Sequence, residues 1–181
     1  MTITPDTKDW TWVLERPCPD CGYDAGSLPR GDLPGTVRQV AAVFADVLAA
    51  GEPTRRRPAP GTWSPLEYGC HVRDVVRRAD ARTALMLTTD DPALENWDQD
   101  ATAVEDAYPE QDPGRVAAEL VEAAERLARI YEGLGDDAWD RPGRRSDGAR
   151  FTVLSFGRYV AHDLVHHVHD VTGAPPGPAT R

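Results

Sequence analysis

Apolar residues recur at helical spacing in four separate stretches of this chain, and this periodicity limits the possible folds more than any other feature. The stretches cover residues 33–50, 65–88, 113–134 and 152–172. In the first stretch Val37, Val40 and Phe44 belong to one apolar stripe, which a helix buries against its neighbours. No convincing pattern of paired strands lies between the stretches. The sequence therefore predicts an all-α protein, a four-helix bundle, and such bundles hold metal ligands on facing helices.

The sharpest helix boundary is the segment from Ser64 to Glu67. Ser64 can cap the helix, Pro65 suits its first position, and Glu67 can accept a hydrogen bond from the Ser64 amide, which completes a capping box. His71 follows on the same helix, in line with Val75, so it faces the core side. A buried ionisable group needs a partner, and a metal ion shared with another helix would supply one.

The chain has 5 histidines, and four of them lie in the predicted last helix. There His162, His166 and His169 fall within an arc of about 60°, whereas His167 points well away from them. The pair His162 and His166, four residues apart, can offer two imidazoles to one metal ion. Together with His71 this pair predicts a three-histidine site with open coordination positions, which is catalytic rather than structural geometry. The alternatives are a solvated histidine face, or core histidines bonded to backbone carbonyls.

Four further residues are candidates for supporting this metal site. Asp74, one turn after His71, and Asp163 can accept hydrogen bonds from the N–H groups of the ligand imidazoles. His169 or Glu67 can move a proton during a reaction.

Residues 1–32 differ in character from the rest, and we expect them to form an extension wrapped on the surface of a single bundle domain that covers residues 33–181. The extension contains a Cys-Pro-x-Cys-Gly turn with Cys18 and Cys21, which resembles the turns that present two thiolates in zinc and iron sites. The chain has 3 cysteines, so only Cys70 is left and a closed four-cysteine site is impossible within one chain. The pair is therefore a redox-active dithiol, half of a metal site, or a reduced turn that only packs.

Two irregular segments between the predicted helices are candidates for the walls of a substrate pocket. The segment from Thr88 to Gln111 holds Trp97 and is too long for a plain connection in a compact bundle. The loop from Asp136 to Arg150 holds Arg144 and Arg145, which can receive a carboxylate or phosphate. The alternative is that both segments are solvated connections.

Composition excludes several classes of protein. The formal charge of −10 argues against a nucleic-acid partner, and no apolar run reaches the roughly 20 residues that span a bilayer. An odd number of cysteines does not make a disulfide framework, and the N-terminus lacks a signal pattern, so we expect a cytoplasmic protein. Lys8 is the only lysine among the 20 lysines and arginines, which indicates a bacterial source with a GC-rich genome.

With these residues in place, the chain resembles the DinB superfamily over roughly residues 33 to 173. Its pattern is a Trp-Ser-x-x-Glu segment leading into a helix with a histidine, and two histidines four residues apart on the fourth helix. Here the first part is Trp63 to Glu67 followed by His71, and the second is His162 and His166. The resemblance implies an up-down-down-up bundle, frequently a homodimer, with zinc or nickel held by three side chains.

The resemblance also implies a function. Characterised members include transferases and isomerases that use mycothiol, bacillithiol or glutathione, and an open position on the metal favours the thiol in its thiolate form. We therefore expect a metal-dependent thiol S-transferase that acts on small electrophiles, and the GC-rich composition favours mycothiol as the cosubstrate. The alternatives are a metal-binding protein without turnover, and a redox or stress-response protein that works through Cys18 and Cys21.

Overall fold

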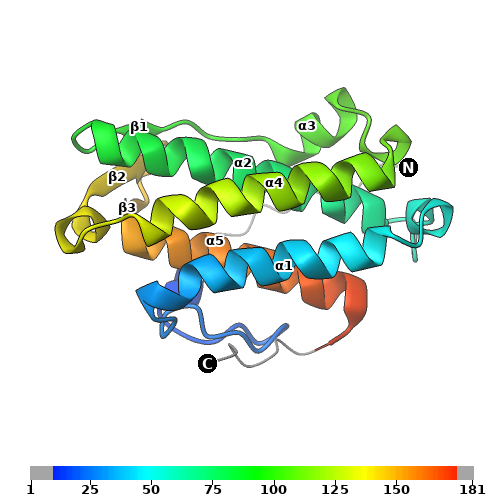
Figure 1. Ribbon diagram of the computed structural model, residues 1–181, viewed down its shortest axis with the longest axis horizontal. Helices are drawn as coiled ribbons and strands as arrows, with labels where there is room; N and C mark the ends of the chain where they lie inside the picture. The colour runs from blue at the N-terminus through cyan, green and yellow to red at the C-terminus, as the bar shows by residue number, and fades with distance from the viewer. Residues whose placement is uncertain (1–9, 175–181) are drawn as a thin grey trace.

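The computed structural model describes residues 10–174, and the fold is a four-helix bundle (Figure 1). The bundle consists of α1 (Leu33–Leu48), α2 (Pro65–Thr88), α4 (Pro113–Glu132) and α5 (Val153–Thr172). These are the four helices that the apolar stripes predict, and the all-α prediction is confirmed. The predicted ranges run past the observed ends of α1 and α4, where Leu48 and Glu132 are the last helical residues.

The helices follow the up-down-down-up order. In Figure 1, α1 and α5 run in one direction along the bundle, and α2 and α4 run in the other. Around the bundle, α4 packs between α1 and α2, while α5 packs against α1 and α2 on the other side. Because α2 and α4 run the same way, the chain must return along the whole bundle to connect them. That return explains why the segment after α2 is so long.

The connection between α2 and α4 carries secondary structure of its own, namely β1 (Ala93–Leu94), α3 (Gln99–Glu105) and the 3-10 turn η4 (Tyr108–Glu110). Asp98 caps α3, because its side chain accepts hydrogen bonds from the amides of Asp100 and Ala101. The structure therefore holds this segment as an ordered wall along the bundle.

A small three-stranded sheet closes one end of the bundle, and no pattern in the sequence predicts it. β1 pairs in parallel with β2 (Pro142–Arg145), which pairs in antiparallel fashion with β3 (Arg150–Thr152). Strands of this length are too short to produce a readable alternation of apolar and polar residues. At Gly143 an added Cβ would lie 3.0 Å from the Met86 side chain, so glycine lets β2 approach α2 closely. The sheet ties the long connection to the loop before α5.

Two helices begin at capping boxes. At α2 the Glu67 amide donates to Ser64 Oγ (3.2 Å) and the Ser64 amide donates to Glu67 Oε2 (2.8 Å), as the sequence predicts. At α5 Thr152 and Ser155 form the same reciprocal pair. Each box satisfies backbone amides that the first turn of a helix leaves without partners.

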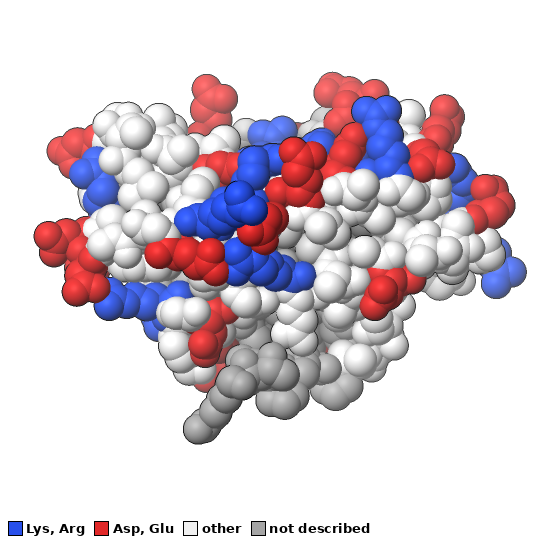
Figure 2. Space-filling view, viewed as in Figure 1, with Lys and Arg blue, Asp and Glu red and all other residues white. Residues whose placement is uncertain are grey.

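The core consists of the apolar stripes of the four long helices. Its fully buried members include Phe44, Leu120, Leu127 and Leu164. Burial of one such side chain stabilises the fold by about 1.5–3 kcal/mol. On the outer face of α4, basic and acidic side chains alternate and form ion pairs such as Arg38 with Glu125 (2.7 Å), and Figure 2 shows no broad surface of one sign there. No helix within residues 10–174 is long and apolar enough to cross a membrane.

The described part of the N-terminal extension, residues 10–32, lies against the bundle. Its first 3-10 turn, η1 (Thr11–Leu14), packs on α5, and a second turn, η2 (Arg30–Asp32), leads into α1. Arg158 on α5 donates from Nε to the Leu28 carbonyl at 2.9 Å. Residues 1–9 of the predicted extension lie outside the described residues.

Candidate functional site

Helix α5 carries two pairs of potential metal ligands, and each pair has the i, i+4 spacing. One pair is His162 and His166, and the other is Asp163 and His167. The pairs are offset by one residue, which turns them about 100° apart around the helix, so they face different neighbours. Asp163 and His167 join His71 of α2, while His162 and His166 join two cysteines of the N-terminal extension. Within each group the ligand atoms lie within 4.8 Å of one another.

The first group, His71, Asp163 and His167, joins α2 to α5. Asp163 lies between the two imidazoles, with Oδ2 3.8 Å from His71 Nε2 and Oδ1 3.5 Å from His167 Nε2. Asp170 lies 2.8 Å from His167 Nδ1. A carboxylate at this position orients a histidine and leaves its Nε2 available as a ligand. The group therefore presents two imidazoles and a carboxylate to one point.

His71 shows that this group fits a metal ion. The residue is only 1% exposed, and neither ring nitrogen has a hydrogen-bond partner among the described residues. Trp97 stacks on the imidazole with an interplanar angle of 7°, and Trp63 covers it from another direction. A buried polar group without a partner is costly, and a metal bound to one nitrogen would remove part of that cost. Two histidines and one carboxylate are a donor set that divalent transition metals accept.

Electrostatics within the group favour metal binding. Burial lowers the pKa of His71, so its imidazole is neutral and can act as a ligand. Burial works to raise the pKa of Asp163, but His167 and His71 outweigh it and hold this pKa far below its usual range. Burial also works to lower the pKa of His167, yet Asp163 and Asp170 raise it to about 9. A metal ion would therefore displace a proton from His167.

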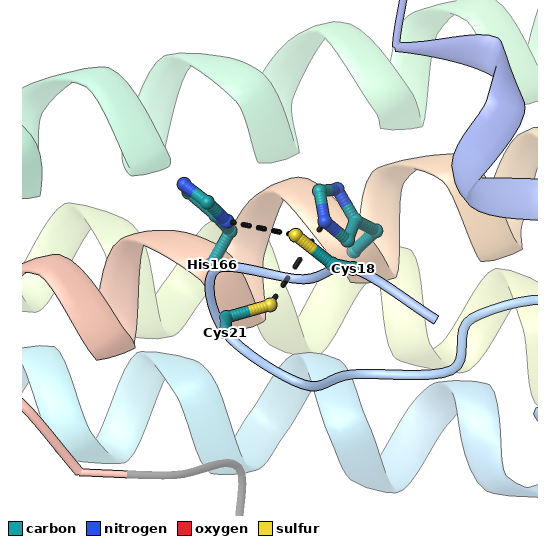
Figure 3. Close-up of side chains that lie close together, drawn as sticks. Cys18, Cys21 and His166 are labelled. Carbon is teal, nitrogen blue, oxygen red and sulfur yellow. Dashed lines mark hydrogen bonds between the residues drawn. The ribbon is translucent and has the colours of Figure 1, made fainter. Parts of the chain in front are cut away.

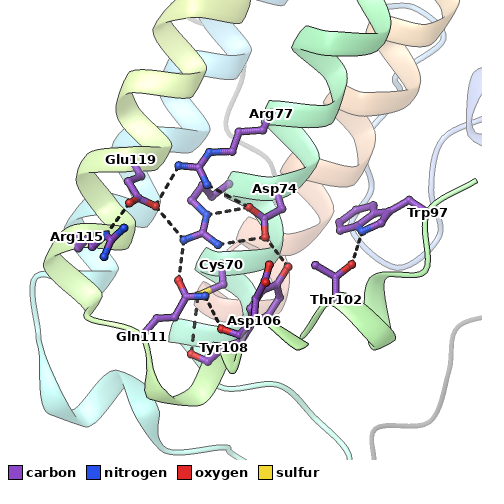
Figure 4. Close-up of polar contacts among 11 residues, drawn as sticks. Cys70, Asp74, Arg77, Trp97, Thr102, Asp106, Tyr108, Gln111, Arg115 and Glu119 are labelled. Atoms are coloured by element: carbon purple, nitrogen blue, oxygen red, sulfur yellow. Dashed lines mark hydrogen bonds and ion pairs between the residues drawn. The ribbon is translucent and has the colours of Figure 1, made fainter. Parts of the chain in front are cut away.

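A cavity of about 140 Å³ opens beside this group. His71 and Asp163 contribute to its wall, together with Trp97 from the long connection. The Trp97 indole donates to Thr102 Oγ1 at 2.6 Å (Figure 4), so α3 holds the ring in place. The remaining lining residues come from α2, α5, the start of α3, the end of β2 and the segment before α3: Val75, Arg78, Ala79, Arg82, Asn96, Gln99, Arg145, Phe156, Tyr159 and Val160.

Three arginines line the cavity, and one of them, Arg145, is already paired with Asp147 at 2.6 Å. Arg78 lies 4.5 Å over the Trp97 ring, and Arg145 donates from Nη1 to the Tyr159 hydroxyl at 3.2 Å. Burial and the charges of Arg78 and Arg145 lower the pKa of Arg82, which shows that the three cations crowd one another. An anionic ligand would relieve this repulsion.

The second group lies between the extension and α5. Cys18 Sγ is 3.7 Å from His166 Nδ1, and Cys21 Sγ is 3.9 Å from His162 Nε2 (Figure 3). Burial raises the pKa of the Cys21 thiol to about 11, the opposite of what an activated redox cysteine shows.

The three histidines predicted to share one metal ion divide between the two groups. His71 lies in the first group, and His162 and His166 lie in the second.

Asp74 and Glu67 belong to hydrogen-bond networks outside the predicted metal site. Asp74 pairs with Arg73 (2.9 Å) and accepts a hydrogen bond from the Tyr108 hydroxyl (2.6 Å) in a network between α2 and α4 (Figure 4). The Glu67 carboxylate caps α2 and pairs with Arg57 through Arg57 Nε at 2.8 Å. The described contacts therefore give both carboxylates structural partners.

His169 and Arg144 also point elsewhere, whereas Trp97 and Arg145 line the cavity. His169 Nδ1 lies 3.0 Å from the Ala174 carbonyl at the end of α5. Arg144 pairs with Asp91 at 2.8 Å and is not part of the cavity wall.

Sequence reasoning missed His167 as a partner of His71. Its signal was present in the spacing Asp163-x-x-x-His167, which is the same i, i+4 spacing as in the histidine pair. The contribution of Asp170 follows from that pairing, because it lies one turn further along the same face.

Comparisons with known proteins agree with this fold. The sequence profile of the DinB superfamily matches residues 35–171. The solved structure of YfiT from Bacillus subtilis superposes with a TM-score of 0.63 at 21% sequence identity, and the match covers 95% of this chain and 91% of that one. None of the curated proteins matches the chain significantly in sequence. The likeness to YfiT is one of fold.

Proposed function

Because the chain belongs to the DinB superfamily, we propose that it is a metal-dependent enzyme whose divalent ion is held by His71, Asp163 and His167. We propose further that it forms a bond between the sulfur of a low-molecular-weight thiol and a small electrophile, as the thiol loses its proton and the electrophile loses its leaving group. The observation that carries the proposal is the buried His71 imidazole, which has no hydrogen-bond partner among residues 10–174 and lies at the wall of a cavity.

The number of ligands supports catalysis rather than a structural role. Three protein ligands leave at least one coordination position of a zinc ion open to water or substrate, whereas four protein ligands leave none open. A divalent metal held by this group would lower the pKa of a bound thiol from about 8.5, so that the thiol would react as a thiolate. The adjoining cavity gives a substrate access to His71 and Asp163.

The side chains around the group supply binding and orientation. Arg78, Arg82 and Arg145 favour a substrate with a carboxylate or phosphate, because the arginine fork matches such anions. Trp97 excludes water from one face of His71, and Asp170 holds the His167 ring in place. An anionic electrophile is therefore the substrate class that this cavity suits best.

Mycothiol is the proposed thiol, and this choice rests on composition. The single lysine among the 20 lysines and arginines indicates a GC-rich bacterial source. The proposed cosubstrate carries sugar hydroxyls, which need polar partners, and Asn96 and Gln99 at the cavity offer them.

Hydrolysis is a second candidate, and the size of the cavity favours it. A volume of about 140 Å³ suits a small ester or amide better than a thiol that carries sugars. YfiT is described as "a probable metal-dependent hydrolase", which is the activity that this alternative would share. The same arginines would then bind an anionic group of the hydrolysed substrate.

The experiment compares both reactions in zinc-loaded and metal-free protein. Mycothiol, cysteine and glutathione are each tested with a bimane or chlorodinitrobenzene electrophile, and nitrophenyl esters with and without a carboxylate are tested in parallel. We expect transfer with mycothiol to depend on the metal and to be abolished in His71→Ala. His169→Ala, a control on the helix that carries the other two ligands, should keep the activity. Equal background rates with all three thiols would reject the transferase, and ester hydrolysis that depends on both metal and His71 would establish the second candidate.

A further inference from the structure

Cys18, Cys21, His162 and His166 form a group that the catalytic proposal does not use. Two ligands come from the N-terminal extension and two from α5, more than 140 residues further along the chain, as the separations of 141 and 148 residues show. We propose that this group is a second metal site, a closed zinc site with two cysteines and two histidines, and that it fastens the extension to the bundle.

The distances match tetrahedral zinc. With Zn–S near 2.3 Å and Zn–N near 2.0–2.1 Å, a tetrahedron puts sulfur and nitrogen ligands about 3.6 Å apart. The two measured sulfur–nitrogen distances are 3.7 and 3.9 Å, and all four ligand atoms lie within 4.8 Å of one another. Zinc would therefore need only small movements of the side chains. Two sulfurs and two imidazoles in a tetrahedron are typical of zinc or iron among the biological metals.

The turn that carries the cysteines has the form of a metal knuckle. The Gly22 amide donates to the Cys18 carbonyl at 2.8 Å, and the Cys18 amide donates to the Tyr23 carbonyl at 2.9 Å. Gly22 has a φ of +77°, a backbone conformation that suits glycine. These contacts bend the chain so that both thiols point toward α5, as Figure 3 shows.

The site is closed to substrate. Cys18, Cys21 and His162 are each at most 3% exposed. The Trp10 ring covers both imidazoles, with its centroid 5.6 Å from that of His162 and 5.4 Å from that of His166. None of the four ligands lines the cavity beside His71. Four protein ligands in an enclosed position are typical of structural zinc, in contrast to the three ligands of the first group.

Such a site would fix the rotation of α5. His162 and His166 each directly adjoin a residue of the first group, Asp163 and His167. When zinc holds one pair against the extension, the helix presents the other pair to His71. The second site would therefore position the first without taking part in its chemistry.

Cobalt substitution tests the proposal on the full-length protein. Only a site with cysteine ligands gives sulfur-to-cobalt charge-transfer absorption, so the two sites can be told apart. We expect wild-type protein loaded with Co²⁺ to show this absorption, and the double variant Cys18→Ser/Cys21→Ser to lose it together with one ion per chain. Cys70→Ser, a control at the third cysteine, should keep it. His71→Ala should also keep it while losing the other ion, so failure of the catalytic proposal would leave this result unchanged.

Two spectroscopic results would overturn the proposal. One is the absence of sulfur-to-cobalt absorption in cobalt-loaded wild-type protein, and the other is unchanged absorption in Cys18→Ser/Cys21→Ser. If the variant does not fold, the measurement described next tests the site on the wild type alone. In a second experiment, zinc-loaded protein is titrated with an organomercurial, and released zinc is detected with a chelating dye. One zinc ion should be released as two thiols react. Thiol modification without zinc release would count equally against the site.

Discussion

His166 and His167 are consecutive residues of α5, yet their imidazoles belong to two different groups of potential metal ligands. The two rings are 5.9 Å apart between centroids and are nearly perpendicular, at 79°. One faces the cysteines of the N-terminal extension and the other faces His71 on α2. A single turn of helix thus contributes to two sites that we propose to have different purposes.

Replacing Asp170 should weaken metal binding at the first group. Asp170 lies 2.8 Å from His167 Nδ1, and loss of such an orienting carboxylate typically lowers metal affinity 10–100-fold, by an order-of-magnitude estimate. We expect Asp170→Asn to lower the affinity for Zn²⁺ by about this factor in calorimetric titrations. The measurement uses a Cys18→Ser/Cys21→Ser background, which removes both thiol ligands of the second site, and Asp140→Asn is the control on an exposed carboxylate. Equal affinities of the Asp170 and Asp140 variants would contradict the assigned orientation.

Replacing Arg82 should impair the use of anionic substrates. One charge-assisted hydrogen bond contributes about 1.5–3 kcal/mol, which corresponds to roughly a 10- to 100-fold increase in KM. Arg82→Gln should show this increase for an electrophile or ester that bears a carboxylate, and little change for its neutral analogue. Arg144→Gln removes an arginine that pairs with Asp91 outside the cavity, so it serves as the control. A similar loss for charged and neutral substrates would show that Arg82 is structural.

Glu67 should contribute stability that depends on pH. Burial works to raise the pKa of its carboxyl, but hydrogen bonds from Arg57 and Ser64 outweigh it, and the pKa lies below its usual value. The folded state thus binds the proton more weakly than the unfolded state, so the contribution is complete above the unfolded pKa of about 4.3. It is lost as the pH falls through the lower folded pKa.

Glu67→Gln tests this dependence. Loss of the cap and of the pairing with Arg57 should destabilise the protein by about 2 kcal/mol at neutral pH. Urea unfolding at a series of pH values should show the gap to wild type narrowing below about pH 4.3. Glu110→Gln, at an exposed carboxylate, is the control. If the difference in unfolding free energy stays constant down to the lowest pH at which the protein folds, the charge of the Glu67 carboxylate does not contribute to stability.

Removing the second metal should destabilise the whole protein. A ligand present at 100 times its dissociation constant stabilises the folded state by about 2.7 kcal/mol, and a domain of this size changes its Tm by about 2–4 °C per kcal/mol. Chelation should therefore lower the Tm of the wild type by roughly 5–10 °C. In Cys18→Ser the fall on chelation should be smaller, because the second site has lost one of its four ligands and binds metal more weakly. Asp20→Asn, in the same turn, should respond as the wild type does, and an unchanged response in Cys18→Ser would argue against a stabilising site.

Local signals explain why so much of the fold could be predicted. Four apolar stripes and the capping box at Ser64 mark the helices, because both patterns depend on residues a few positions apart. The small sheet could not be predicted in this way, since β1 contains only Ala93 and Leu94. Its strands form because the long connection and the loop before α5 meet at one end of the bundle.

The site was harder to predict because it depends on the rotation of one helix. A difference of one residue, about 100°, decides whether His166 or His167 faces His71, and apolar periodicity does not fix rotation that closely. The position of Cys18 and Cys21 depends on the path of residues 10–32 across α5, which is a contact between distant parts of the chain. The residue types were recognisable from sequence, but their grouping required the tertiary structure.

Helix α5 follows every other ligand-bearing segment in chain order, so it is the last of them to be synthesised. Before residues 162–170 leave the ribosome, the nascent chain has only Cys18, Cys21 and His71 from the two groups. At about 5–20 residues per second, seconds of translation separate the cysteine turn from its histidine partners. A chain truncated before α5 would therefore lack both sites at once, and metal content would report whether synthesis reached the last helix.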